Sequence, residues 1–179
     1  MNLPNRLTIF RVILIPFFLF FLLTDYCGTA GKFIALGIFA LASLTDLLDG
    51  KIARKRNLVT NFGKFMDPIA DKLLVCSALI SFVQLQLLPA WIVIILIARE
   101  FIISGFRLVA SDGGIVLAAS WWGKFKTTFQ MIMCLLLIIN LDYAAVNIIE
   151  QIFIYASLAL SLISLIDYLI KNRKVIADM

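Results

Sequence analysis

Four aspartates within a stretch of 26 residues are the side chains of this sequence best suited to chemistry. Asp46 and Asp49 are three residues apart, and Asp67 and Asp71 are four residues apart, so each pair occupies one face of a helix. Four carboxylates that converge in a low-dielectric setting repel one another, and a hard divalent cation relieves that repulsion. Oxygen-only ligands suit Mg²⁺, Mn²⁺ or Ca²⁺, and Mg²⁺ is commonly held by carboxylates together with substrate phosphates. The spacing therefore favours a metal site over ordinary loop charges and helix caps.

The residue types that are absent from the sequence exclude several kinds of catalysis and metal binding. The sequence contains no histidine, which excludes histidine acid–base catalysis, haem with a histidine ligand and Cys/His zinc sites. Its three cysteines are far apart and include no CxxC spacing, so they are interpreted as core or lipid-facing thiols. A carboxylate is therefore the natural general base for a reaction that activates a hydroxyl.

A second group of charged residues is basic and lies later in the chain. Arg99 falls near the middle of an apolar stretch, where an unpaired arginine costs at least ~2.5–3.5 kcal/mol. Adjacent helical residues do not face each other, so Glu100 is not expected to be its partner, and Asp167 is the rival ion-pair partner. The alternative is a cationic pocket for an anionic group such as phosphate. Its members would be Arg99, Arg107, Lys124 and Lys126, although Lys126 could equally be a flanking charge.

The elements that must position these residues are membrane spans. Of all residues 63% are hydrophobic and only 15% are charged, whereas a soluble domain averages about 25% charged residues. A span takes about 20 residues. The sequence predicts an all-α integral membrane protein with a single domain over residues 1–179. Six spans are expected near residues 7–26, 32–50, 68–88, 90–110, 122–141 and 147–169, with Pro89 breaking the long apolar run 73–98.

The distribution of Lys and Arg predicts the orientation. With the N-terminus in the cytoplasm, nearly all basic residues fall on inner segments, as the positive-inside rule requires. Both termini are then cytoplasmic, and a short interfacial segment precedes the first span, with Asn5 as a candidate N-cap. The longest inner loop, near residues 51–66, is too short to fold alone. An active site would therefore be built at the cytoplasmic face of the cell (inner or plasma) membrane.

The acidic stretch also resembles a known signature. From Asp46 to Asp71 it reads Asp-x-x-Asp-Gly-x-x-Ala-Arg, then eight residues, then Gly-x-x-x-Asp-x-x-x-Asp. All eight fixed positions match the signature of the CDP-alcohol phosphotransferase family. The six-span plan with a cytoplasmic site is also similar to that family, so the resemblance covers essentially the whole chain.

The resemblance implies a reaction and assigns roles to the matching residues. Family members displace CMP from a CDP-linked lipid or alcohol with the hydroxyl of a second alcohol. It implies that Asp46, Asp49, Asp67 and Asp71 bind two divalent ions, Mg²⁺ or Mn²⁺, with Asp71 also the general base. Gly50, Ala53, Arg54 and Gly63 would shape the CDP pocket. The resemblance further suggests a homodimer, and no nucleic-acid partner is expected.

The basic residues bear on the choice of acceptor. Residues 5–11, Arg99-Glu100-Phe101 and Gly123-Lys-x-Lys-Thr127 are similar to bacterial family members that join sn-glycerol 3-phosphate to CDP-diacylglycerol and release CMP. An inositol phosphate acceptor would need a basic pocket too. A cation or proton transporter is the alternative from another class, since buried acids and an intramembrane arginine are typical of it. The acids of this chain cluster at one face without a visible repeat, which favours the phosphotransferase.

Overall fold

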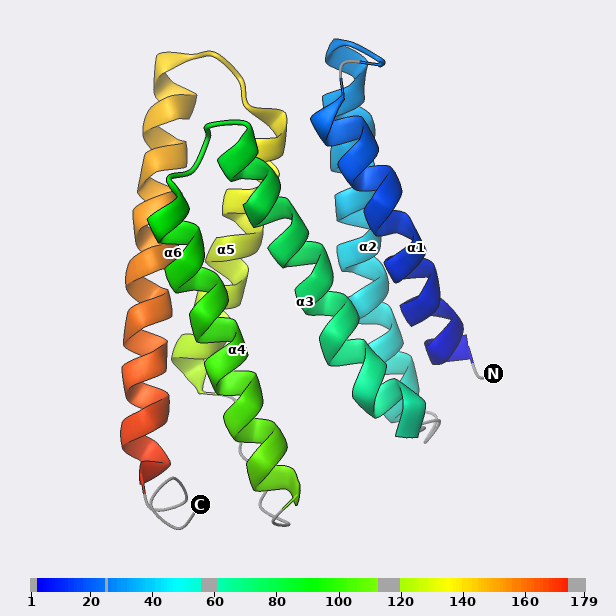
Figure 1. Cartoon of the computed structure of the whole chain (residues 1–179), viewed down its shortest axis with the longest axis vertical. Helices are drawn as coiled ribbons and strands as arrows, with labels where there is room; N and C mark the ends of the chain where they lie inside the picture. Colours follow the sequence, from blue (N-terminus) through cyan, green and yellow to red (C-terminus); the bar gives the residue numbers. More distant parts are fainter. Residues whose placement is uncertain (1–2, 25, 56–60, 113–119, 174–179) are drawn as a thin grey trace. The chain divides into compact units, whose positions relative to one another are not determined.

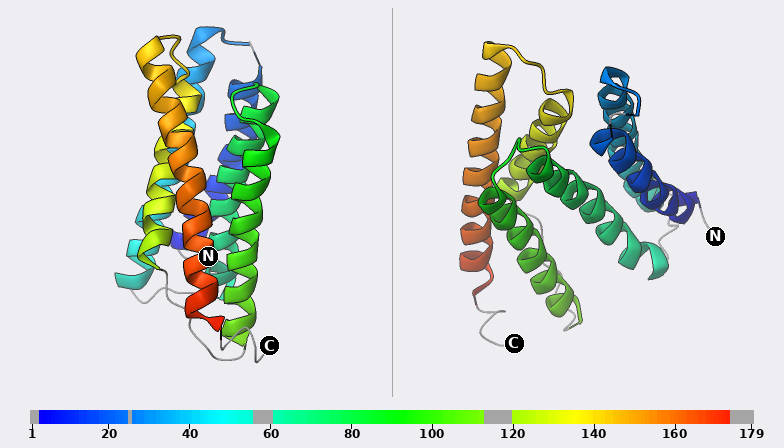
Figure 2. Two further views of the ribbon diagram at one scale, coloured as in Figure 1. Left: turned by 90° about the vertical axis from the view of Figure 1, so that its left-hand side faces the viewer. Right: turned by 45° about the horizontal axis from the view of Figure 1, so that its top comes forward.

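A computed structural model describes residues 3–24, 26–55, 61–112 and 120–173 of the chain. Within these ranges, the side chains of residues 3–4, 46–55, 61–65, 67–68 and 112 lie outside the description. The described residues form helices joined by short connections, as the prediction of an all-α protein requires. Figures 1 and 2 show these helices from three directions.

The described helices number six, in the order that the apolar stretches predict. They are α1 (Leu3–Leu23), α2 (Thr29–Lys55), α3 (Asn61–Gln84), α4 (Ala90–Asp112), α5 (Trp121–Ile139) and α6 (Ala144–Lys171). The chain divides into two compact units, the first made of residues 1–88 with 137–139, the second of residues 89–136 with 140–179.

The first unit is built from α1, α2 and α3. α1 contacts both other helices, and α2 also contacts α3. Phe18 of α1 and Phe39 of α2 are both fully buried, with ring centroids 5.5 Å apart. Ala35 and Ala42 lie one turn to either side of Phe39 and are also fully buried, so small side chains let the helices approach closely. This packing brings polar residues of α1 against the half of α2 that precedes the aspartates.

The second unit is built from α4, α5 and α6. Leu96 of α4, Met133 of α5 and Ile154 of α6 are buried, and the rings of Phe129 and Phe153 lie 5.4 Å apart between α5 and α6. α5 begins with a side-chain cap, because Ser120 accepts a hydrogen bond from the backbone N–H of Gly123 at 3.1 Å. The cap places the start of α5 next to the charged residues of α4.

The break at Pro89 is confirmed. α3 ends at Gln84, and α4 begins at Ala90. Gln86 adopts a left-handed conformation with φ of 59°, and the backbone N–H groups of Leu87 and Leu88 both donate to the carbonyl of Phe82. The turn thus satisfies carbonyl and amide groups that a helix end leaves without partners.

Two local predictions are wrong. Asn5 is not an N-cap, because α1 begins at Leu3 and Asn5 is its third residue. The loop expected near residues 51–66 is much shorter, since α2 continues to Lys55 and α3 begins at Asn61. Charged side chains do not end a helix that neighbouring helices hold, so the drop in hydropathy near residue 51 marked the end of the apolar run and not the end of α2.

The length and composition of the helices support the membrane character of the chain. Three described segments are long and apolar enough to cross a membrane: Asn5–Leu23, Trp121–Ile139 and Ala144–Lys171. A shorter apolar segment covers Thr29–Thr45 of α2. Large apolar side chains are exposed on these helices, among them Phe17, Phe33 and Ile152, as expected for surfaces that face lipid.

Candidate active site

The two aspartate pairs lie on α2 and α3 of the first unit. Asp49 is six residues before the end of α2 at Lys55, and Asp67 is six residues after the start of α3 at Asn61. α2 and α3 run in opposite directions (Figure 1), so both positions lie about 9 Å along the helix axis from the connection between them. Asp46 and Asp71 lie about one turn further along. The backbone thus sets the two pairs at matching heights on neighbouring helices.

The side chains of this acidic region are only partly described. Asp71 is half-buried on α3, and the residue has an interaction within the protein. The side chains of Asp46, Asp49 and Asp67, and those at the predicted CDP-pocket positions Gly50, Ala53, Arg54 and Gly63, lie outside the described residues. The convergence of four carboxylates therefore stays a prediction. Carboxylate oxygens alone are the donor set that fits Mg²⁺ or Mn²⁺.

The structure adds a buried polar face of α1, which the sequence analysis had not identified as a face. Asn5, Thr8 and Arg11 are spaced three residues apart, and all three are buried although most of α1 is apolar. Arg11 is fully buried, and its Nε donates to the backbone carbonyl of Ala42 on α2 at 3.2 Å. Ala42 is one helical turn before Asp46. Polar residues at this spacing in an apolar helix are the sequence signal that could have identified this face.

The second unit contains a buried network of charges that joins its three helices. Arg99 on α4 and Lys126 on α5 are only 7% and 2% exposed. Both donate to the same atom, Oε1 of Glu100, at 2.8 Å in the case of Arg99 Nη1. Arg99 also donates through Nε and Nη2 to Oγ of Ser164 on α6, at 3.2 and 2.8 Å. Two positive charges thus share one carboxylate, which leaves one positive charge in excess.

The expectation that Glu100 would not pair with Arg99 is wrong. Adjacent positions point about 100° apart around a helix. The side chains of Arg99 and Glu100 are nevertheless long enough to bend toward each other and form a hydrogen bond. Lys126 supplies the reason, because it draws the carboxylate toward α5 and into reach of Arg99. Asp167, the rival partner, pairs instead with Lys171 at 2.7 Å, one turn further along α6.

The other two predicted phosphate-binding cations are in a different setting. Arg107 and Lys124 are exposed. The guanidinium of Arg107 lies 5.9 Å from the ring centroid of Tyr168, and the ammonium of Lys124 lies 4.5 Å from that of Trp121. Contacts of this kind are worth about 0.5–1 kcal/mol at exposed sites. The four cations therefore form two classes, a buried pair and an exposed pair.

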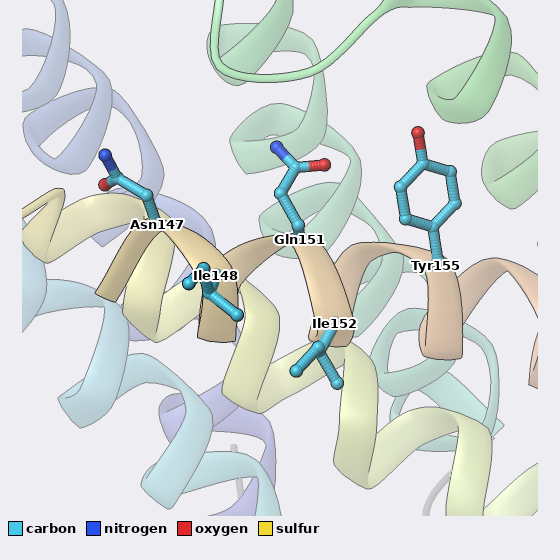
Figure 3. A pocket seen from close by; sticks show the side chains of 5 residues that line it. All are labelled: Asn147, Ile148, Gln151, Ile152 and Tyr155. Carbon is cyan, nitrogen blue, oxygen red and sulfur yellow. The ribbon is translucent and has the colours of Figure 1, made fainter. Parts of the chain in front are cut away.

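A separate hollow lies along α6. It is lined by Asn147, Ile148, Gln151, Ile152 and Tyr155, and Asn147, Gln151 and Tyr155 project to one side of the helix (Figure 3). None of the predicted site residues lines it. It lies toward the start of α6, two or more turns away from Ser164.

Comparison with known proteins decides between the two classes of function. Three relatives are named CDP-diacylglycerol–glycerol-3-phosphate 3-phosphatidyltransferase. That of Bacillus subtilis is 46% identical over 170 residues, which cover 89% of this chain and 86% of that protein. That of Haemophilus influenzae is 48% identical over 138 residues, covering 73% and 72%. That of Escherichia coli K12 is 38% identical over 188 residues, covering 99% and 98%.

The family assignment covers the acidic signature, the buried charge network and most of the helices. Residues 1–163 match the CDP-alcohol phosphatidyltransferase family. The matched range contains both aspartate pairs and the three charged residues Arg99, Glu100 and Lys126. The resemblance inferred from the eight signature positions is thereby confirmed, and the transporter alternative is excluded. This chain belongs to the CDP-alcohol phosphatidyltransferase family, and it is an enzyme of lipid synthesis.

Proposed function

We propose that this chain transfers the phosphatidyl group from CDP-diacylglycerol to sn-glycerol 3-phosphate, yielding phosphatidylglycerophosphate and CMP. The names of relatives at 38–48% identity support this substrate pair. The structural observation that carries it is the excess positive charge of the buried network in the second unit, where Arg99 and Lys126 share Glu100.

The acceptor's phosphate is the anion that this network would bind. A buried cluster with one uncompensated positive charge is costly, and a bound anion removes that cost. The guanidinium of Arg99 has a planar set of donors that matches phosphate oxygens, and Lys126 adds a point charge. Arg107 and Lys124 are exposed. We therefore assign them the role of attracting the anionic acceptor electrostatically before Arg99 and Lys126 bind it.

The aspartates of the first unit would act on the pyrophosphate. Asp46, Asp49, Asp67 and Asp71 would hold the two Mg²⁺ or Mn²⁺ ions that the resemblance implies, and such ions stabilise negative charge on the phosphate oxygens. Asp71 would also take the proton from the attacking hydroxyl of glycerol 3-phosphate. The new bond forms between that oxygen and the phosphatidyl phosphorus, while the bond to the CMP oxygen breaks. Gly50, Ala53, Arg54 and Gly63 would shape the pocket for CDP.

The membrane setting of the proposal follows from the lipid substrate. The acyl chains of CDP-diacylglycerol remain in the bilayer, so its pyrophosphate lies at the interface. We propose six spans with both termini in the cytoplasm, in line with the distribution of Lys and Arg, and a reaction at the cytoplasmic face of the cell membrane. A homodimer is also proposed, on the resemblance to the family.

An acceptor panel tests the substrate pair. The purified full chain is given CDP-diacylglycerol and, in turn, glycerol 3-phosphate, inositol phosphate, glycerol, inositol or serine, and CMP release is measured. We expect turnover with glycerol 3-phosphate and almost none with glycerol, because the cations would then be left without an anion. Preference for inositol phosphate would show a phosphate acceptor of another kind. Efficient use of glycerol or serine would refute the phosphate-acceptor argument.

The proposed base is tested by Asp71→Asn, which keeps the size of the side chain but cannot take up the proton. We expect kcat to fall by roughly 10²–10⁴-fold while CDP-diacylglycerol still binds. Chelation by EDTA should abolish activity, and Mg²⁺ or Mn²⁺ should restore it. A near-normal rate in Asp71→Asn would remove that residue from the role of base, and full activity in excess EDTA would refute metal dependence.

A further inference from the structure

The guanidinium of Arg99 uses three of its five N–H bonds inside the second unit. Nε and Nη2 each donate one to Oγ of Ser164, and Nη1 donates one to Glu100. One N–H on each Nη nitrogen remains, and no residue in the described part of the chain accepts a hydrogen bond from either. Because Arg99 is only 7% exposed, leaving these two buried donors without an acceptor costs free energy, and a bound ligand that accepts from them removes that cost.

Ser164 is itself held in one orientation. It is fully buried, and its hydroxyl donates to the backbone carbonyl of Ser161 at 2.9 Å. A hydroxyl has one hydrogen and two acceptor lone pairs. With the hydrogen directed to Ser161, both lone pairs face Arg99, so the hydroxyl holds the Nε–Nη2 edge of the guanidinium at two points. Ser164 of α6 thus fixes the orientation of the Arg99 guanidinium, which belongs to α4.

The first turn of α5 lies beside the edge of Arg99 that stays available. A Cβ atom at Gly123 would be 3.6 Å from Arg99 Nη2 and 3.6 Å from Ser120 Oγ. No side chain therefore separates Nη2 from the backbone at the start of α5. The N-terminus of a helix favours an anion through its free N–H groups and its dipole. The available donors of Arg99 and the N-terminus of α5 thus belong to one surface.

We propose that Ser164 is a positioning residue for the acceptor: its hydroxyl holds the Arg99 guanidinium so that two N–H bonds point toward the acceptor's phosphate beside Gly123. This inference rests on the proposed function, because it takes Arg99 to be a ligand of the acceptor. Ser164 touches neither substrate, and its effect passes through Arg99. Removal of the hydroxyl should therefore weaken acceptor binding and leave the lipid substrate and the chemical step nearly unchanged.

The chain offers a matched control for the test. Ser157 lies two turns before Ser164 on the same buried face of α6, is also fully buried, and its Oγ has no partner among the described residues. The variants Ser164→Ala, Ser164→Thr and Ser157→Ala are purified as full chains in detergent. Initial rates of CMP release are measured with glycerol 3-phosphate and CDP-diacylglycerol each varied in turn, and thermal unfolding is recorded for every variant.

We expect Ser164→Ala to raise KM for glycerol 3-phosphate about ten-fold, since hydrogen bonds to charged groups are worth enough for such a change. kcat and KM for CDP-diacylglycerol should stay within about two-fold of the unmodified values. Ser164→Thr retains the hydroxyl and should restore most of the acceptor affinity, and Ser157→Ala should behave as the unmodified chain. If Ser164→Ala does not yield folded protein, Ser164→Cys replaces it, because a thiol is similar in size and accepts weakly.

The inference, but not the proposed function, would be overturned by an unchanged KM for glycerol 3-phosphate in Ser164→Ala or by the same increase in Ser157→Ala. A parallel loss of kcat, both KM values and thermal stability would also overturn it, since that pattern indicates a packing role. The failure of the proposed function looks different. If the proposed function is wrong, the unmodified chain releases no CMP on addition of glycerol 3-phosphate. The inference about Ser164 is then wrong as well.

Discussion

The buried and the exposed cations of the second unit differ in how they are held. Arg99 and Lys126 lie inside the unit, share a carboxylate oxygen and connect three helices. Arg107 and Lys124 lie on α4 and α5 as well, but they are exposed and each rests near one aromatic ring. The sequence grouped all four as candidate phosphate ligands, although only Arg99 stood near the middle of an apolar stretch.

This difference in burial indicates which cations can determine the choice of acceptor. A buried cation has few neighbouring waters, so its interaction with an anion is weakly screened, and its position is set by several hydrogen bonds. An exposed cation is screened by water and salt, and it can move. We therefore expect the buried pair to set acceptor affinity and the exposed pair to contribute a smaller, salt-dependent share.

The largest effect is expected when the shared carboxylate is removed. Glu100→Gln leaves Arg99 and Lys126 facing each other without a negative charge, and loss of one partner from a buried ion pair costs about 3 kcal/mol or more. Thermal unfolding in detergent measures the loss. The double variant Glu100→Gln/Lys126→Met should recover part of it, because only one buried cation then lacks a partner.

Asp167→Asn is the control for this change. Its carboxylate pairs with Lys171, which is 62% exposed, and exposed helical pairs of this spacing are worth about 0.3–0.5 kcal/mol. Equal losses of stability in Glu100→Gln and Asp167→Asn would contradict the special role given to the buried network.

The same substitution at two arginines tests the contrast on acceptor affinity. Arg99→Lys keeps the charge but cannot hold Ser164 with two N–H bonds and Glu100 with a third, so KM for glycerol 3-phosphate should rise about 30-fold. Arg107→Lys loses little more than a contact with Tyr168, and KM should rise less than about three-fold. Steady-state rates of CMP release give both values, and a reversed order would remove burial as the deciding factor.

The two lysines of α5 repeat the contrast, and the exposed one is expected to give the smallest effect of all. Lys126→Met removes a buried charge of the network, and KM for glycerol 3-phosphate should rise about ten-fold. Lys124→Met removes an exposed charge near Trp121, and the change should be about two-fold at low salt and vanish at high salt. Rates at two ionic strengths provide the measurement, and a salt-independent effect of Lys124→Met would show that this lysine is held at the site.

Local signals in the sequence predicted the elements and the family. The apolar runs located six helices in the described residues, and Pro89 located the break between α3 and α4. The eight signature positions identified the family, because a match of both residue type and spacing at eight positions is specific. The end of α2 was missed, since charged residues lower hydropathy without ending a helix.

Only the tertiary structure separated the buried cations from the exposed ones. Arg99 and Arg107 lie on one helix, eight residues apart, and nothing local to either residue says which one faces Ser164. Burial depends on which helices pack together, and Ser164 is 65 residues from Arg99 in the chain. Residue types and short spacings are determined by the sequence itself. The partner of a buried charge is decided by packing, because the free energy of a charge depends on every group that replaces its water.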